Sequence, residues 1–535
     1  MQNNAMQITL GVAGCGVMGR GIAQIAAQAG VQVLLFDANA ASCGNARSTL
    51  LAQWAKLQEK GKLTAQQVDA STAALRVAAS LEELAGCDIV VEAIVEQLDA
   101  KRALFAALEG IVRTDCILAT NTSSLAVTAI AAGCQHPARV AGFHFFNPVP
   151  LMKVVEVISG ALTAEPVAQQ LCLLAERLGH RPVRARDTPG FIVNHAGRGL
   201  ITEALRIVQE CVADFATVDA VLTGAAGFRL GPFQLLDLTG LDVSHPVMES
   251  IYSQYYQEPR YRPSLITRQR LSAGLLGRKS GRGFYDYDGG AAVPVAPVRS
   301  DLRAAADGFV AAPGSVPVAI PEAQAALVAA SAAVPPVWIG PCSVAARAQL
   351  EGLLLRCGAQ LDAGSQPGAQ TLCLVAPLGE DVSACVERGG LDAARTLGID
   401  TLTDCAGHLT LMKNPATHPH YAAQALALLA RSNQGVSLID DSFGFIVQRV
   451  LAMIINIACD MLQQGICSPP DLDAAVTLGL AYPRGPLAWG DALGARRILS
   501  ILQNLARSSG DPRYRPSPWL TRRAQLGLSL LHVAT

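Results

Sequence analysis

The chain has 535 residues, of which 51% are hydrophobic, a length that corresponds to about three or four domains. The 42 lysines and arginines nearly balance the 43 aspartates and glutamates, so the composition favours neither a nucleic-acid-binding protein nor an acidic disordered one. The 14 cysteines form no C-x-x-C pair, which is typical of a reducing, cytoplasmic setting and predicts no metal site. The balanced charge leads us to expect small-molecule partners, and we expect neither a secretory signal nor a membrane span.

The N-terminal segment has the pattern of a strand, a glycine turn and a helix. An apolar strand over residues 8–13 leads into the turn, and a helical pattern follows over residues 22–29. The turn consists of Gly14, Cys15, Gly16, Val17, Met18 and Gly19. Glycines at this spacing allow a tight turn, a close approach of the backbone to a pyrophosphate and packing of the helix on the sheet. The pattern predicts a dinucleotide site, although such spacing also occurs in ordinary turns.

Asp37 follows the second predicted strand, residues 31–36. A carboxylate at the end of that strand can accept hydrogen bonds from both ribose hydroxyls and repels a 2′-phosphate, so NAD is favoured over NADP. The alternative interpretation of Asp37 is a cap of the following helix or turn.

Further strands are predicted over residues 88–91, 117–119 and 140–143, with helical patterns between them. Strands that alternate with helices favour a parallel, doubly wound sheet of the Rossmann type. Glu92 and Glu96 follow the first of these strands, where ligands bind in open sheets, and Lys101 lies on the next helix. Each would by itself be a solvated charge, and the glycine turn is what makes a role at the cofactor plausible.

A histidine and a glutamate stand out in the next part of this domain. His144 lies in the run His-Phe-Phe-Asn-Pro, and Glu156 is the only acid in the apolar, strand-like stretch 151–158. Burying an ionised carboxylate without a partner is costly, so Glu156 either forms a structural salt bridge or holds a histidine. Beside a nicotinamide, an imidazole, with its unperturbed pKa of about 6.5, suits proton transfer during alcohol oxidation, so we expect His144 to be the base.

The chain is predicted to be helical from residue 187, and this helical part recurs later. The echoes are Asp187–Asn194 with Asp441–Gln448, Gly231-Pro232 with Gly485-Pro486, and Arg260–Pro263 with Arg513–Pro516. The near-constant offset, 254 residues falling to 253, indicates a duplicated domain. We therefore predict an α/β plus all-α architecture: a Rossmann domain (1–186), a helical domain (187–288), a linker (289–336), a reduced Rossmann-like domain (337–440) and a second helical domain (441–535).

Five motifs, in the same order, closely resemble those of the L-3-hydroxyacyl-CoA dehydrogenase family. They are the glycine turn with Asp37, residues 90–96, Asn121–Leu125, His144–Lys153 and Pro189–Asn194. The long form, with Leu487–Gly490 and Arg513–Pro516 in its second half, is similar to the bacterial branch that includes the 3-hydroxyadipyl-CoA dehydrogenases of phenylacetate degradation. The resemblance covers the chain except for the linker and implies NAD-dependent oxidation of an L-3-hydroxyacyl-CoA to the 3-oxoacyl-CoA.

The resemblance also implies a role for each matching residue. His144 would be the base, and Glu156 would orient its ring. Ser123 and Asn194 would hydrogen-bond the reacting hydroxyl or the thioester carbonyl. The residues implied to contact NAD are those of the glycine turn with Asp37, Glu96, Lys101, Ser123, Asn147 and Lys279. The residues implied to bind the acyl-CoA substrate are Ser123, Asn194, Lys56 and Lys60. Without the resemblance, Ser123 would be interpreted as a helix cap, Asn194 as a surface amide, and Lys56 and Lys60 as part of a solvated helix face.

Two features depart from the family pattern. His195 follows the motif asparagine where the family commonly has arginine, and the repeat carries Arg449 at that position. The second half lacks both the glycine turn and the His-Phe-Phe-Asn-Pro run, and Gln448 stands in place of Asn194. We expect this half to pack rather than catalyse, with the two helical domains imitating a dimer within one chain of a homo-oligomer.

The sequence leaves the acyl group open. The alternatives to 3-hydroxyadipyl-CoA are 3-hydroxybutyryl-CoA of general fatty-acid metabolism and a free β-hydroxyacid, whose dehydrogenases typically use a lysine base. Arg198, one helical turn after Asn194, is a candidate partner for a terminal carboxylate, or else part of a surface salt bridge. A non-catalytic protein is a further alternative, because this family has given rise to a lens crystallin, but the intact candidate site argues against it.

Overall fold

The computed structural model describes residues 8–287, 292–294, 309–310 and 335–533. Its contacts divide the chain into two compact units, and each is described by itself. The first comprises Met1–His195 together with Met461–Ala481, and the second comprises Ala196–Asp460 together with Tyr482–Thr535.

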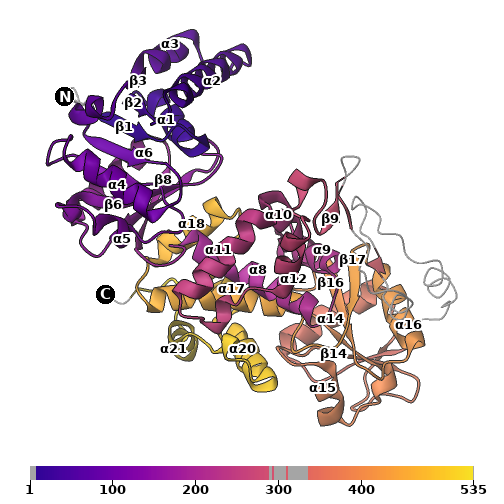
Figure 1. Cartoon of the computed structure of the whole chain (residues 1–535). Helices are drawn as coiled ribbons and strands as arrows, with labels where there is room; N and C mark the ends of the chain where they lie inside the picture. The colour runs from indigo at the N-terminus through magenta and orange to yellow at the C-terminus, as the bar shows by residue number, and fades with distance from the viewer. Residues whose placement is uncertain (1–7, 288–291, 295–308, 311–334, 534–535) are drawn as a thin grey trace, which may run out of the picture. The chain divides into compact units, whose positions relative to one another are not determined.

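The first unit is built on an eight-stranded sheet flanked by helices (Figure 1). Its strands are β1 (Thr9–Ala13), β2 (Gln32–Phe36), β3 (Leu75–Val77), β4 (Ile89–Glu92), β5 (Ile117–Thr120), β6 (Val140–Phe145), β7 (Val154–Ser159) and β8 (Arg181–Arg186). Its helices are α1 (Val17–Gln28), α2 (Ala40–Glu59), α3 (Ala65–Ala74), α4 (Leu98–Glu109), α5 (Val127–Ala131), α6 (Glu165–Arg177) and the first residues of α7 (Val193–Ala196). The order β3-β2-β1-β4-β5-β6-β7-β8 is that of a doubly wound sheet, as predicted.

One strand pair differs from the expected parallel arrangement. β7 runs antiparallel to β6, whereas the other neighbours in this sheet are parallel. Only residues 146–153 separate the two strands, too few for the helical crossover that a parallel pair requires. The antiparallel register places His144 directly opposite Glu156.

The sequence missed β3 and β8. β8 alternates Arg184 and Arg186 with the buried apolar residues Val183 and Ala185, so its charges hide a strand. A helix from the second half of the chain, α18 (Pro469–Gly479), packs against β7 and β8 (Figure 1).

The second unit contains the rest of both helical repeats and a second sheet. Its helices are α8 (Arg198–Gln209), α9 (Phe215–Ala226), α10 (Pro232–Thr239), α11 (Leu241–Gln254), α12 (Leu265–Ser272), α14 (Val344–Arg356), α15 (Val382–Gly389), α16 (Pro419–Ala430), α17 (Ile446–Gln463), α19 (Pro486–Leu493), α20 (Ala495–Ser509) and α21 (Pro518–Leu526). α17 continues by three residues into the first unit.

The second sheet has seven strands in the order β11-β17-β16-β15-β14-β12-β13. They are β11 (Phe309–Val310), β12 (Val337–Ile339), β13 (Leu361–Asp362), β14 (Leu372–Val375), β15 (Thr396–Ile399), β16 (His408–Lys413) and β17 (Gly435–Ile439). β15 and β16 are antiparallel, like β6 and β7. In the described residues no strand corresponds to β4, because β12 lies directly beside β14.

Most of the predicted linker, residues 289–336, lies outside the described residues. Two pieces of it are paired strands: β10 (Val293–Pro294) pairs with β9 (Tyr285–Asp286), and β11 pairs with β17.

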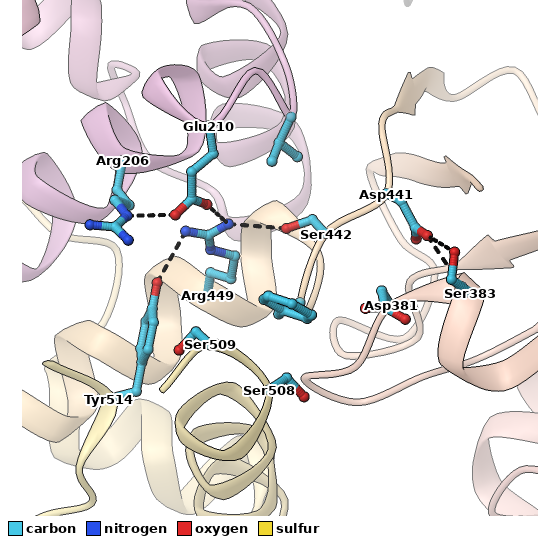
Figure 2. A pocket seen from close by; sticks show the side chains of 12 residues that line it. Arg206, Glu210, Asp381, Ser383, Asp441, Ser442, Arg449, Ser508, Ser509 and Tyr514 are labelled. Atoms are coloured by element: carbon cyan, nitrogen blue, oxygen red, sulfur yellow. Dashed lines mark hydrogen bonds and ion pairs between the residues drawn. The ribbon is translucent and has the colours of Figure 1, made fainter. Parts of the chain in front are cut away.

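The two helical repeats contact each other within the second unit. Gly199 on α8 lies so close to α17 that a Cβ atom added to it would be 2.8 Å from the Cα of Ile454. Arg449 on α17 is 2.7 Å from both Glu203 of α8 and Glu210, which follows the end of α8. Figure 2 shows Arg449 between Glu210, Ser442 and Tyr514, beside a pocket of about 430 Å³. Arg449 and Glu203 are buried and paired, whereas Glu210 is exposed, so the repeats share a buried ion pair at their contact.

α17 is long and apolar enough to cross a membrane by length and composition alone, but 89% of its apolar window is buried inside the protein. It is therefore a core helix of the second unit.

Candidate active site

The glycine turn of the first unit forms a tight cradle between β1 and α1. Gly14 has a φ of +108°, and a Cβ atom there would lie 2.5 Å from the Ala93 carbonyl oxygen. At Gly19 a Cβ atom would lie 1.8 Å from the Gly14 carbonyl oxygen, whereas Gly16 faces open space. Only glycine fits at positions 14 and 19. The free space at Gly16 leaves room for a pyrophosphate at the N-terminus of α1. The residues present therefore fit a dinucleotide.

Asp37 is tied to this turn. It follows β2 and accepts hydrogen bonds from the backbone N–H groups of Cys15 (2.8 Å) and Asn39 (2.9 Å). Of the other residues in the turn, Cys15 is buried and Val17 is exposed. The acid expected to bind the ribose thus lies directly beside the expected pyrophosphate site.

Lys101, on α4, forms ion pairs with two carboxylates. Its ammonium is fully buried and lies 2.5 Å from Glu92 and 3.2 Å from Glu96. Glu92 also accepts a hydrogen bond from the Thr120 hydroxyl at 2.6 Å. Burying a charged lysine requires such compensation, so Lys101 acts here on Glu96 rather than facing solvent. The sequence placed Glu92 and Glu96 together at this strand end but did not predict that Lys101 pairs with both.

Glu96 anchors the loop that carries Ser123. One of its carboxylate oxygens accepts hydrogen bonds from the Thr122 hydroxyl (2.7 Å) and from the N–H groups of Ser123 (2.9 Å) and Ser124 (3.1 Å). Burial raises the pKa of Glu96, but the Thr122 hydrogen bond and the Lys101 charge outweigh it, so the net pKa is lowered. Glu96 is therefore ionised at neutral pH and fixes the loop after β5.

His144 and Glu156 form a buried pair. The Nδ1 atom of His144 lies 2.5 Å from a carboxylate oxygen of Glu156, and the Glu156 side chain is fully buried. The other oxygen of Glu156 accepts hydrogen bonds from the N–H groups of Ile192 and Val193, each at 2.9 Å. These three contacts compensate the buried carboxylate. The sequence predicted the pair but not the two amides, because backbone donors leave no trace in residue type.

Asn194 is carried to the same place by the backbone. It follows Val193 directly at the start of α7 and is half-buried. The preceding turn contains Gly190 (φ +77°) and Phe191 (φ +47°). The ring of Phe191 lies 5.8 Å from that of His144. The structure thus gathers His144, Glu156 and Asn194 at one end of β6 and β7.

The remaining predicted residues are more scattered. Asn147 is exposed just after β6, and Lys56 and Lys60 are exposed at the end of α2. Lys279 lies in the second unit, where it forms an ion pair with Asp242. The described contacts of these four residues do not test their predicted roles.

Comparison with known proteins agrees with this site. The model of the 3-hydroxyacyl-CoA dehydrogenase NAD-binding domain matches residues 9–188, and that of the C-terminal domain matches residues 190–287 and again 444–529. A 3-hydroxyadipyl-CoA dehydrogenase of Escherichia coli is 37% identical over 97% of this chain and 98% of that protein. A probable 3-hydroxybutyryl-CoA dehydrogenase of Bacillus subtilis is 43% identical over 52% of this chain and 96% of that protein.

A solved structure spans the same length. A crystal structure from Escherichia coli described as a 3-hydroxybutyryl-CoA dehydrogenase has a TM-score of 0.80 at 36% identity and covers 97% of this chain and 98% of its own. The full-length likeness includes the second half, and the double match of the C-terminal model agrees with the duplication expected from the sequence. The chain therefore belongs to the 3-hydroxyacyl-CoA dehydrogenase family of NAD-dependent oxidoreductases.

Proposed function

We propose that this chain oxidises the hydroxyl group of an L-3-hydroxyacyl-CoA thioester, with His144 as the general base. The observation that carries the proposal is the buried His144–Glu156 pair, next to a strand edge whose glycine turn fits NAD. When bound at that turn, NAD would supply the acceptor for the hydride that leaves the carbon bearing the hydroxyl. The chain's own residues must then bind the thioester and remove the hydroxyl proton.

The hydrogen bonds of Glu156 define which nitrogen of His144 is basic. A carboxylate only accepts, so the Nδ1 atom of His144 must carry the proton that points to Glu156. In the neutral ring the Nε2 atom is then unprotonated and can take the proton of the substrate. The imidazolium that forms is stabilised by the adjacent negative charge, since Glu156 is shielded from water.

Ser123 and Asn194 are proposed to orient the substrate. Ser123 lies in a loop that Glu96 holds by five hydrogen bonds, one of them from the Ser123 hydroxyl at 3.3 Å, and Asn194 follows the amide that binds Glu156. Both side chains are therefore presented by backbone that is itself fixed. Such fixed donors can hold the reacting hydroxyl or the thioester carbonyl in one geometry for hydride transfer. Asn147, Lys101 and Lys279 remain proposed NAD contacts, and Lys56 and Lys60 remain proposed CoA contacts.

For the acyl group we propose a dicarboxylic chain such as 3-hydroxyadipyl-CoA. The full-length likeness to a protein of that name supports it. Arg198, four residues after Asn194 in the sequence, is the proposed partner of the terminal carboxylate. Burial lowers the pKa of Arg198 to about 10, with Tyr482 opposing that shift, and the side chain is half-buried rather than on the surface. 3-Hydroxybutyryl-CoA is the second candidate, because the full-length crystal structure carries that description.

A substrate panel with one variant tests both proposals. NADH formation is compared for 3-hydroxyadipyl-CoA, 3-hydroxybutyryl-CoA and free 3-hydroxybutyrate. We expect the highest kcat/KM with the dicarboxylic thioester, and His144→Gln should lower turnover by about 10²–10⁴ with NAD binding nearly unchanged. His420→Gln, which changes an exposed histidine of the second unit, is the control and should have normal turnover.

The outcomes separate the parts of the proposal. Preference for the butyryl thioester would show that the proposed dicarboxylic acyl chain is wrong. Activity on the free acid alone would refute the proposal that the substrate is a thioester. Normal turnover of His144→Gln would refute the role of His144 as the base.

We also propose that the two helical repeats take the place of a dimer within one chain. The contacts of Arg449 with Glu203, which is buried, and with Glu210 support this, because they join the repeats as two subunits would be joined. A reducing, cytoplasmic location is proposed from the cysteines, all 14 of which are free thiols.

A further inference from the structure

A segment from the second half of the chain belongs to the unit that carries the candidate active site. Residues Met461–Ala481, which include α18, group with Met1–His195. The N–H group of Arg186, at the end of β8, donates to the Ile466 carbonyl at 2.8 Å. Three residues of α18 are completely buried, namely Leu472, Ala475 and Val476. The segment is therefore an integral part of the first core.

The same exchange occurs in the opposite direction. The N–H group of Asp440, after β17, donates to the Val212 carbonyl at 2.9 Å, and α9 packs against β16 and β17. Asp440 lies 254 residues after Arg186, and Ile466 lies 254 residues after Val212. Each helical repeat thus sends its second long helix to the Rossmann-like sheet of the other half. The exchange is present in both directions although the second half lacks the candidate active-site residues.

In the first unit the exchanged helix ends against the backbone that holds Glu156. A Cβ atom added to Gly479, the last residue of α18, would lie 2.9 Å from Val193 Cγ2 and 3.5 Å from Val154 Cγ1. The Val193 N–H group donates to Glu156, and Val154 begins the strand that carries Glu156. The side chain of Val193 is buried and branched, so it cannot yield to a larger neighbour without moving its backbone.

The backbone before Val193 also needs support. Phe191 has a φ of +47°, a conformation that costs a non-glycine residue about 1–3 kcal/mol and persists only when surrounding structure enforces it. β7 lies on one side of this turn, and Gly479 packs against Val193, which ends it. We propose that the segment 461–481, with Gly479 at its point of contact, is a positioning element that fixes the Ile192 and Val193 amides on Glu156 and so orients His144.

This inference rests on the proposed role of His144. It gives the second half of the chain a task in the reaction although that half lacks the candidate catalytic residues: its helix holds the carboxylate that sets the proton on His144. Gly479 touches neither substrate nor cofactor in this account and acts only through Val193.

The test is Gly479→Ala in the full-length chain. We expect kcat to fall about tenfold, because displaced amides move Glu156 away from His144. Weaker stabilisation of the imidazolium should also shift the acid limb of the kcat–pH profile to lower pH. The KM for NAD should stay within about twofold, since the glycine turn lies at β1.

The repeat supplies a matched control. Gly224, near the end of α9, packs on the second sheet: an added Cβ atom would lie 2.7 Å from the Cβ of His408, which stands on β16 at the place of Val154 on β7. Gly224→Ala should lower Tm at least as much as Gly479→Ala while kcat and its pH profile stay normal. Equal loss of kcat in both variants, or a normal profile in Gly479→Ala, would overturn the inference.

A second pair of variants covers the case in which Gly479→Ala does not fold. Leu472→Ala removes buried side-chain volume from α18, and Val218→Ala does so at the corresponding place in α9. Only the former should shift the pH profile. If His144→Gln is inactive while Leu472→Ala keeps a normal profile, the positioning inference fails alone. If His144→Gln is active, the proposed function fails first.

Discussion

The two Rossmann-like domains keep the same antiparallel strand pair but not the same residues on it. In the first domain, His144 on β6 lies opposite Glu156 on β7. In the second, the same step of the β15–β16 ladder places Asp400 opposite Thr410. Both pairs are buried, so the pairing of these strands is maintained by their apolar neighbours and backbone hydrogen bonds. The strand pair is thus a scaffold that does not depend on a catalytic pair.

The residue that stands in the repeat at the position of Asn194 forms hydrogen bonds within the second domain. Gln448 stands there, and its amide nitrogen donates to Asp400 (2.9 Å) and to the Pro377 carbonyl (3.0 Å). Its oxygen accepts the N–H group of Gly379 at 2.8 Å. Burial raises the pKa of Asp400, which the Gln448 hydrogen bond opposes. The polar groups of Gln448 are thus satisfied within the second domain.

The acids after the second strand of each domain differ in the same way. Asp37 binds the N–H group of Cys15 in the glycine turn. Asp362, at the end of β13, binds the N–H groups of Gly364 and Gly368 in its own loop. An acid at the same strand end thus faces a cofactor turn in one case and caps a loop in the other.

Removing one of the two halves should have the largest effect. A chain that ends at residue 335 loses α17 and α18, which exposes the α8 surface at Gly199 and uncovers β7 and β8. We expect it to self-associate or to precipitate, because large exposed apolar patches are rare on soluble monomers. Sedimentation of the truncated and full-length chains checks this. A truncated chain that is soluble, monomeric and active would contradict both the intrachain dimer and the positioning role of α18.

Replacing Glu156 on β7 and the equivalent Thr410 on β16 should have different effects on activity in the two domains. Glu156→Gln presents an amide N–H group to His144 and so forces the other tautomer, which leaves Nε2 protonated; kcat should fall about 10²–10⁴-fold. Thr410→Val, at the equivalent place, should leave kcat within about twofold. Steady-state kinetics of both variants, with folding verified by circular dichroism, checks the contrast. Similar losses would mean that the second domain takes part in the reaction.

His408 should make the stability of the second domain depend on pH in a way that Val154, at the equivalent place in the first domain, does not. It lies on β16 where the first domain has Val154, and burial lowers its pKa from 6.5 to about 4. Between these values the unfolded chain binds the proton and the folded chain does not, so stability falls as the pH falls. The single group predicts a loss of about 2 kcal/mol between pH 7 and pH 5.

The check is the change in Tm between pH 7 and pH 5. His408→Val should show a smaller decrease than the parent chain, because it lacks the proton uptake of the unfolded state. An unchanged decrease would show that His408 is not held neutral. Val154→His would sharpen the comparison by moving the same sensitivity into the first domain.

Much of the first domain followed from residue patterns alone. The glycine turn, Asp37 and the partnership of His144 with Glu156 were predicted because each depends on residue type at short range. β8 was missed because three arginines mask its alternation, and the antiparallel turn of β7 was not foreseen because apolar periodicity carries no strand direction.

The sequence by itself also determined the duplication, since a 254-residue offset can be seen in the letters. Only the tertiary structure decided which repeat covers which sheet. α9 and α18 are apolar enough to pack on either sheet, and hydrophobic burial does not specify its partner. The same holds for the amides of Ile192 and Val193, which any residue could supply: backbone donors acquire a role through position in space, and position here depends on contacts between residues far apart in the chain.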